Sequence, residues 1–140
     1  MMVKAAGNCL LYLLLASGLG AETEANSVDH RAILEKLDDS AFSRGQAIYD
    51  NLCINCHGGD GKTPTLPIAR AFGKGELKFG NDPYSMFLTL TKGNGLMGPQ
   101  TWMTPQERYD VIHYVREKFM KPMHPKYMPV TEEYLAGLPT

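Results

Sequence analysis

Apolar residues recur at helical spacing in three stretches of the chain, separated by segments rich in glycine and proline. The expected bounds of these helices are Ala41 to about Leu52, Asp82 to Gly93, and Thr104 to about Phe119. Each start has a polar capping candidate: Ser40 for the first helix, Asn81 or Asp82 for the second, and Thr104 for the third. Pro83 and Pro105 fit the first turns of the last two helices. The pattern therefore predicts an all-α domain.

Two less regular segments flank this domain. Residues 22–39 are polar, with Ile33, Leu34 and Leu37 at helical spacing, which predicts a short amphipathic helix or an ordered leader. Residues 120–140 carry four prolines and are expected to form an extended tail over the domain surface. A short turn is expected near Thr131, with Tyr134 and Leu135 as its anchors.

The first 21 residues have the pattern of a secretory signal peptide. Lys4 provides a basic start, an apolar run over residues 10–16 follows, and small residues lead to a cleavage site near Gly20 or Ala21. The apolar run is too short to cross a bilayer. We therefore expect a periplasmic or otherwise exported protein without a membrane span, and an uncleaved anchor is the alternative.

The charge balance limits the classes of partner. Without Lys4 the chain has 13 basic and 15 acidic residues, a formal charge of −2. Proteins that bind nucleic acid carry a basic surface, so this balance argues against such a partner. It also gives no sign of one strongly charged docking face.

The most specific motif is the run Cys53-Ile54-Asn55-Cys56-His57. Two thiols separated by two residues and followed at once by a histidine form the attachment signature of c-type haem. Each sulfur bonds to one vinyl group of the porphyrin, and the histidine is placed to bind the iron. Cys53 and Cys56 are thus the predicted attachment sites of one covalent haem, with His57 as its proximal ligand.

Three other readings of the two cysteines fit their context less well. A thioredoxin-like pair would follow a strand, and nothing before Cys53 resembles one. A zinc site would need further ligands at matching spacing, which the remaining histidines do not supply. A disulfide between residues so close on one helical turn would bridge poorly and stabilise little.

The motif and its surroundings resemble the class I cytochromes c. Gly45-Gln46-Ala47-Ile48-Tyr49 ahead of the motif is similar to the family's first helix, and Tyr114 lies in a stretch similar to its closing helix. The resemblance extends from about Ser40 to Lys118. It implies three main helices packed around one haem, with residues 40–119 as the cytochrome c domain. It also implies that the closing helix crosses the first one closely at Gly45.

The resemblance further implies a distal iron ligand from the loop after the middle helix. Met97 is the first candidate and Met103 the alternative, while a vacant or histidine-bound site stays open. The family commonly has Met followed directly by Pro, whereas here Gly98 separates Met97 from Pro99. Trp102 is expected to pack on the distal side, with its indole N–H available to a haem propionate or a backbone oxygen.

These features predict a monomeric electron-transfer protein rather than an enzyme, since no acid–base pair or nucleophile constellation is apparent. Its expected partners are redox proteins: a dehydrogenase, an oxidase or another cytochrome. One alternative is a haem subunit permanently docked to an exported dehydrogenase or oxidase through its tail. Another is a haem enzyme or gas sensor with an open distal site, if Met97 does not bind the iron.

Overall fold

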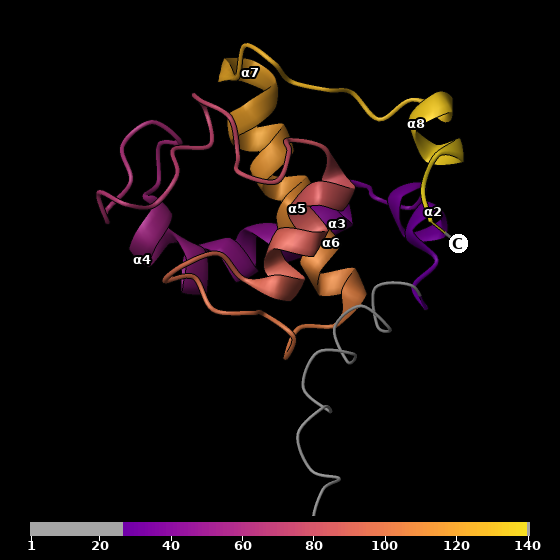
Figure 1. Cartoon of the computed structure of the whole chain (residues 1–140), viewed down its shortest axis with the longest axis horizontal. Coiled ribbons are helices and arrows are strands. Elements are labelled where there is room, and N and C mark those ends of the chain that lie inside the picture. Colours follow the sequence, from indigo (N-terminus) through magenta and orange to yellow (C-terminus); the bar gives the residue numbers. More distant parts are fainter. Residues whose placement is uncertain (1–26, 140) are drawn as a thin grey trace, which may run out of the picture.

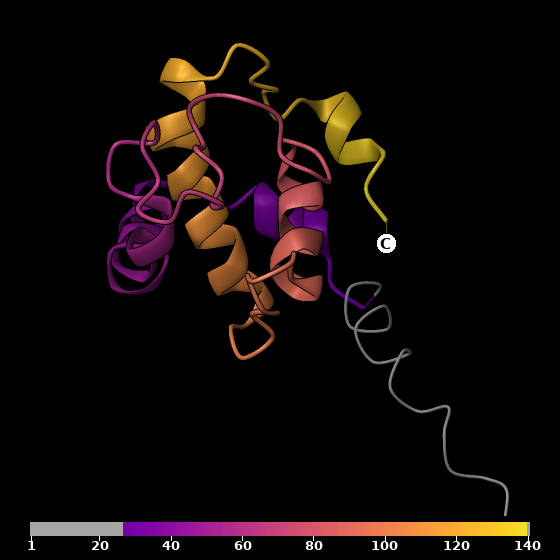
Figure 2. The same ribbon diagram turned by 60° about the vertical axis from the view of Figure 1, so that its left-hand side comes forward.

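Two helical segments cross near the middle of the molecule, and the other elements are arranged around them (Figures 1 and 2). The structure is a computed structural model and describes residues 27–139. Its helices in chain order are α2 (His30–Leu34), α3 (Asp39–Ile48), α4 (Ile54–His57), α5 (Pro83–Lys92), α6 (Pro105–Val115), α7 (Lys121–Met123) and α8 (Glu132–Ala136). Two π-helical turns, η1 (Tyr49–Cys53) and η2 (Arg116–Met120), join α3 to α4 and α6 to α7. Residues 27–139 are thus helices and loops, in agreement with the predicted all-α class.

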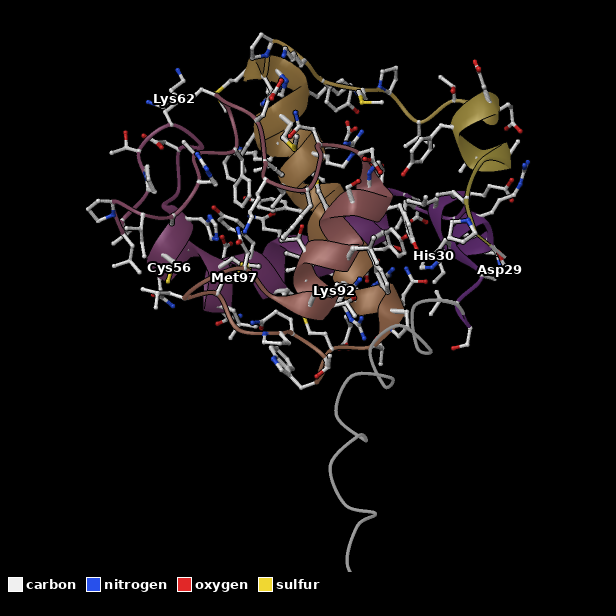
Figure 3. The ribbon with its side chains drawn as sticks, viewed as in Figure 1. Asp29, His30, Cys56, Lys62, Lys92 and Met97 are labelled. Carbon is white, nitrogen blue, oxygen red and sulfur yellow. The ribbon has the colours of Figure 1, made fainter. Side chains whose placement is uncertain are left out.

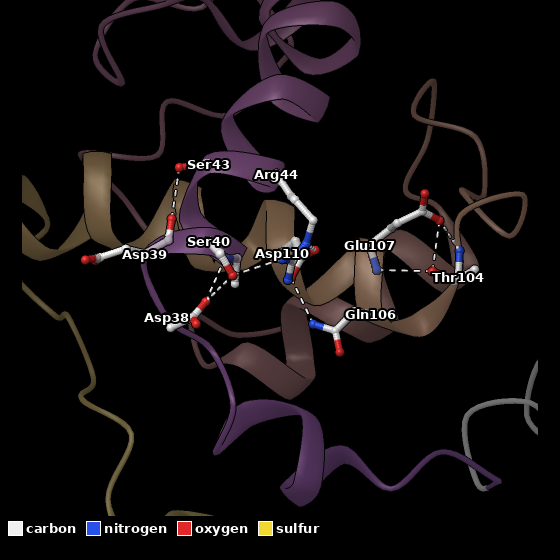
Figure 4. Close-up of polar contacts among 10 residues, drawn as sticks. Asp38, Asp39, Ser40, Ser43, Arg44, Thr104, Gln106, Glu107 and Asp110 are labelled. Atoms are coloured by element: carbon white, nitrogen blue, oxygen red, sulfur yellow. Dashed lines mark hydrogen bonds and ion pairs between the residues drawn. The ribbon is translucent and has the colours of Figure 1, made fainter.

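The first long helix begins earlier than the sequence predicted. Its N-cap is Asp38, whose Oδ1 accepts a hydrogen bond from the backbone N–H of Ala41 at 2.9 Å. Ser40, the predicted cap, instead donates its hydroxyl to the same oxygen at 2.7 Å (Figure 4). The prediction of Ser40 was therefore wrong: a carboxylate two residues earlier reaches the free N–H groups of the first turn.

The predicted caps of the other two main helices are confirmed. The Asp82 carboxylate accepts from the backbone N–H of Ser85 at 3.0 Å, and Pro83 occupies the first turn of α5. Thr104 and Glu107 form a reciprocal capping box at the start of α6 (Figure 4). The closing helix continues through η2 and α7 to Met123, beyond the predicted end near Phe119.

The crossing of α3 and α6 depends on Gly45. A Cβ atom at this position would lie 2.0 Å from the carbonyl oxygen of Asp110 and 3.0 Å from Cβ of Tyr114. Beside the crossing, the Arg44 guanidinium donates to the fully buried Asp110 carboxylate, with Nε to Oδ2 at 2.6 Å (Figure 4). The predicted close approach of the closing helix at Gly45 is therefore confirmed.

The leader packs on the main helices. His30 in α2 is fully buried, and its Nδ1 is hydrogen-bonded to the Tyr109 hydroxyl at 2.8 Å. Its ring forms T-shaped contacts with the rings of Tyr84 and Phe87. Part of the leader lies outside the described residues, as does the predicted signal peptide. No helix within residues 27–139 is long and apolar enough to cross a membrane.

The tail is also attached to the body of its own chain. After an extended segment, Thr131 caps α8, where the sequence predicted a short turn. The Tyr134 hydroxyl donates to the Asp82 carboxylate at 2.8 Å and accepts from the backbone N–H of Tyr84 at 2.9 Å. Leu135 is buried in the core. Helix α8 therefore holds the tail against the start of α5.

We expect Gly45→Ala to destabilise the haem-loaded protein by about 1–3 kcal/mol or more, because the added methyl group cannot fit without separating α3 from α6. Denaturant unfolding followed by circular dichroism measures this loss. Gly137→Ala is the matched control, since its Cβ would have ordinary contacts of 3.6 Å or more. Equal stabilities for the two variants would show that the crossing does not need a glycine.

Candidate functional site

An apolar cleft opens between the cysteine motif and the helices α5 and α6. It contains about 1090 Å³ of space free of protein atoms, part of it open to solvent. Its floor and walls are mainly apolar side chains, among them Tyr49, Leu77, Met86, Leu90, Val111, Ile112 and Val115. Small-molecule and cofactor sites in proteins are concave and mostly apolar, with a few polar or metal-binding groups. The cleft has this character.

Both cysteines of the motif line the cleft. Cys53 ends η1 and Cys56 lies three residues later in α4, so their side chains project from the same side of the helix. Both are half-buried free thiols. Burial, with a smaller contribution from the neighbouring Cys56, raises the pKa of Cys53 to about 11.

His57 lies directly after the second cysteine, and its ring is fixed from two sides. Its Nδ1 is 3.0 Å from the carbonyl oxygen of Arg70, and its ring stacks on Phe72 with 4.6 Å between the ring centroids. A carbonyl oxygen only accepts hydrogen bonds, so Nδ1 carries the proton and Nε2 keeps a lone pair for a metal. This is the arrangement expected of a metal-binding histidine.

The end of α4 places the motif at the rim of the cleft. Gly58 stops the helix with φ of 73°, a conformation that favours glycine. The buried Tyr49 hydroxyl donates to the carbonyl oxygen of Gly58 at 2.6 Å. The turn after His57 is thus attached to the core of the first long helix.

The two methionine candidates occupy different places. Met97 lines the cleft and approaches it from the loop after α5, on the same side of the molecule as Cys56 (Figure 3). Met103 does not line the cleft: its side chain is 3% exposed, and its carbonyl oxygen accepts from Nε of the buried Arg108 at 3.1 Å. Of these two predicted ligands, the structure brings Met97 together with the cysteine motif.

Trp102 lies in the loop before α6, at the surface of the molecule. Its side chain is 63% exposed and does not line the cleft. The indole N–H donates to the side-chain oxygen of Gln100 at 3.1 Å, so it already has a local partner. The neighbouring Met103 takes the buried position, which leaves the indole on the surface.

Sequence reasoning did not identify Arg70 as a partner of His57. The contact is made by a backbone carbonyl, which any residue type could supply, so the sequence held no signal for it. Among residues 27–139, no group of three or more histidine, cysteine, aspartate or glutamate residues is arranged to hold a metal ion. The described chain therefore offers no such cluster as a rival metal site.

These side chains fit a covalently bound haem. Two free thiols and an imidazole with a fixed tautomer lie along one wall, a thioether approaches from another segment, and the space between them is apolar. A thiol pair bonds the vinyl groups, and imidazole with thioether is a known axial pair for haem iron. The fold and the cleft define a helical protein with a covalent haem site.

Comparison with known proteins agrees with this class. The model of the family described as Cytochrome c matches residues 42–118, and the chain belongs to this family. The comparisons with curated proteins and with solved structures returned no match. Its cofactor is one covalent haem c with iron, its chemistry is haem-based electron transfer, and its partners are redox partners.

We expect Cys53→Ala or Cys56→Ala to leave the haem attached through one thioether bond. A remaining vinyl group extends the conjugation of the porphyrin, so the pyridine haemochrome band should move to longer wavelength. In the double variant, acidified organic solvent should extract the haem completely. A single variant with an unchanged haemochrome band would contradict attachment through these two sulfurs.

Proposed function

We propose that this protein is an exported, monomeric carrier of single electrons, with His57 and Met97 as the two axial ligands of its haem. The observation that carries the proposal is the convergence of Cys53, Cys56, His57 and Met97 on one apolar cleft. When bound, haem c supplies an iron that alternates between the Fe(II) and Fe(III) states. The predicted signal peptide supports export. The haem motif supports it as well, because c-type haem is attached outside the bacterial cytoplasm.

The protein's own groups hold the iron site in one geometry. The Arg70 carbonyl and the Phe72 ring fix the orientation of the His57 imidazole. The apolar side chains of the cleft would lower the polarity around the haem, and a thioether ligand in such surroundings favours the reduced state. With both His57 and Met97 bound to the iron, the haem would exchange electrons and would have no position left for a substrate. This argues against an open-site enzyme or gas sensor.

The packing of the tail favours a free carrier over a permanently docked subunit. A tail used for attachment would present its apolar residues to the partner. Here Leu135 is buried against the chain's own core, and the Tyr134 hydroxyl is hydrogen-bonded to Asp82. The anchoring side chains of α8 are thus used within the domain, and only Met128 and Val130, in the segment before α8, stay exposed among the large apolar residues of the described tail.

We expect Met97→Ala to abolish the weak near-infrared band that marks sulfur bound to ferric haem, and to leave the iron high-spin or bound by a solvent ligand. Met103→Ala should keep the band, while the cavity it leaves lowers the free energy of unfolding by about 2–5 kcal/mol. Absorption spectra of both oxidised variants show whether the near-infrared band is present. Loss of the band in Met103→Ala alone would assign the ligand to Met103 instead.

We expect Leu135→Ala to lower the free energy of unfolding of the isolated protein by about 2–5 kcal/mol, because the residue is buried within its own domain. The exposed Glu133→Ala should change it by no more than about 0.5 kcal/mol. Sedimentation should give the mass of one chain at all concentrations. Unchanged stability of Leu135→Ala would favour the docked subunit, and a mass above that of one chain would contradict the monomer.

A further inference from the structure

Met97 belongs to a closed turn rather than to a free loop. The backbone N–H of Asn94 donates to the carbonyl oxygen of Met97 at 2.8 Å, and the N–H of Met97 donates back to Asn94 at 3.2 Å. Gly95, with φ of 62°, lets the chain reverse between them, and Leu96 projects at the tip. Two hydrogen bonds therefore fix the backbone of the proposed ligand.

The turn lies directly against the end of α5. Gly93 ends this helix with φ of 76° and ψ of 175°, a region of backbone conformation open essentially to glycine alone. Its N–H donates to the carbonyl oxygen of Thr89 at 2.8 Å. Beyond the turn, the N–H of Gln100 donates to the carbonyl oxygen of Leu90 at 2.7 Å. Both ends of the segment are thus attached to α5.

The absence of a side chain at Gly93 is what permits this contact. A Cβ atom there would lie 2.7 Å from the carbonyl oxygen of Met97, 2.9 Å from the nitrogen of Pro99 and 3.0 Å from the carbonyl carbon of Gly98. All three are backbone atoms, so none can rotate out of the way. A side chain at residue 93 must push the turn that carries Met97 away from the helix.

We propose that Gly93 is a positioning residue that sets where Met97 meets the iron, an inference that rests on the proposed His57 and Met97 ligation. Helix α5 lines the cleft through Met86 and Leu90, so the end of this helix is a fixed reference for the cleft. The turn packs against Gly93, so the Met97 thioether lies at a fixed distance from the end of α5. Because the backbone is ordered beforehand, binding of Met97 costs little conformational entropy, and other ligands compete poorly with it.

The test compares Gly93→Ala with Gly95→Ala in the haem-loaded protein. Both substitutions place alanine at a glycine with positive φ, but a Cβ at Gly95 would meet nothing within 4 Å. We expect Gly93→Ala to lose most of the near-infrared sulfur band and to bind added imidazole at least about tenfold more tightly, a change of about 1.4 kcal/mol. Its reduction potential should also fall. Gly95→Ala should keep the band, the potential and the weak imidazole binding of the original protein.

A Gly93→Ala protein with an unchanged band and imidazole affinity would overturn the role of Gly93. If Gly93→Ala does not accumulate in folded form, a comparison of Asn94→Pro with Asn94→Ala tests whether the turn positions Met97. Proline removes the N–H that bonds Met97, whereas alanine keeps it. Weaker Met97 binding in Asn94→Pro alone supports the proposal, and equal spectra for both variants overturn it.

Met97→Ala separates this inference from the proposed function. If the band survives in Met97→Ala, the axial assignment fails, and the role of Gly93 fails with it. If the band is lost in Met97→Ala but persists in Gly93→Ala and Asn94→Pro, Met97 is the ligand and only the positioning role is wrong.

Discussion

The contact between Gly45 and the carbonyl oxygen of Asp110 sets the distance between the two long helical segments, and the cleft depends on that distance. The segment that starts with α3 continues through η1 and α4 and carries Cys53, Cys56 and His57. The segment that starts with α6 supplies Val111, Ile112 and Val115 to the opposite wall. A side chain at Gly45 would therefore change the position of one wall relative to the other, far from the iron site itself.

Glycine has a parallel role on both sides of the cleft. Gly58 and Gly93 end α4 and α5 in nearly the same conformation, with φ of 73° and 76° and ψ of 175° in both. One directly follows His57, and the other directly precedes the turn that carries Met97. A Cβ at Gly58 would lie 2.3 Å from the carbonyl oxygen of Thr63. Each helix thus stops abruptly, and the returning chain packs against its end.

Local signals in the sequence predicted much of this arrangement. The caps Asp82 and Thr104 depend on residues within one helical turn, and the haem motif is a contiguous run. The failures involve choices that the local sequence leaves open. Asp38 and Ser40 are both residue types that can cap α3. In the structure the Asp38 carboxylate accepts the backbone N–H of Ala41, and the Ser40 hydroxyl donates to that carboxylate.

Burial of individual residues in the loop before α6 was harder to predict. Trp102 and Met103 are adjacent and both apolar, and only the packing of the whole chain decides that Met103 is buried and Trp102 exposed. The same limit applies to the flanking segments, whose anchors His30 and Tyr134 contact residues more than 40 positions away. These contacts place both segments against α5 and α6 on the side of Tyr84 and Tyr109. Ile68 and Leu96 line the cleft and yet remain exposed, so apolar surface of the cleft reaches the outside of the molecule at these two residues.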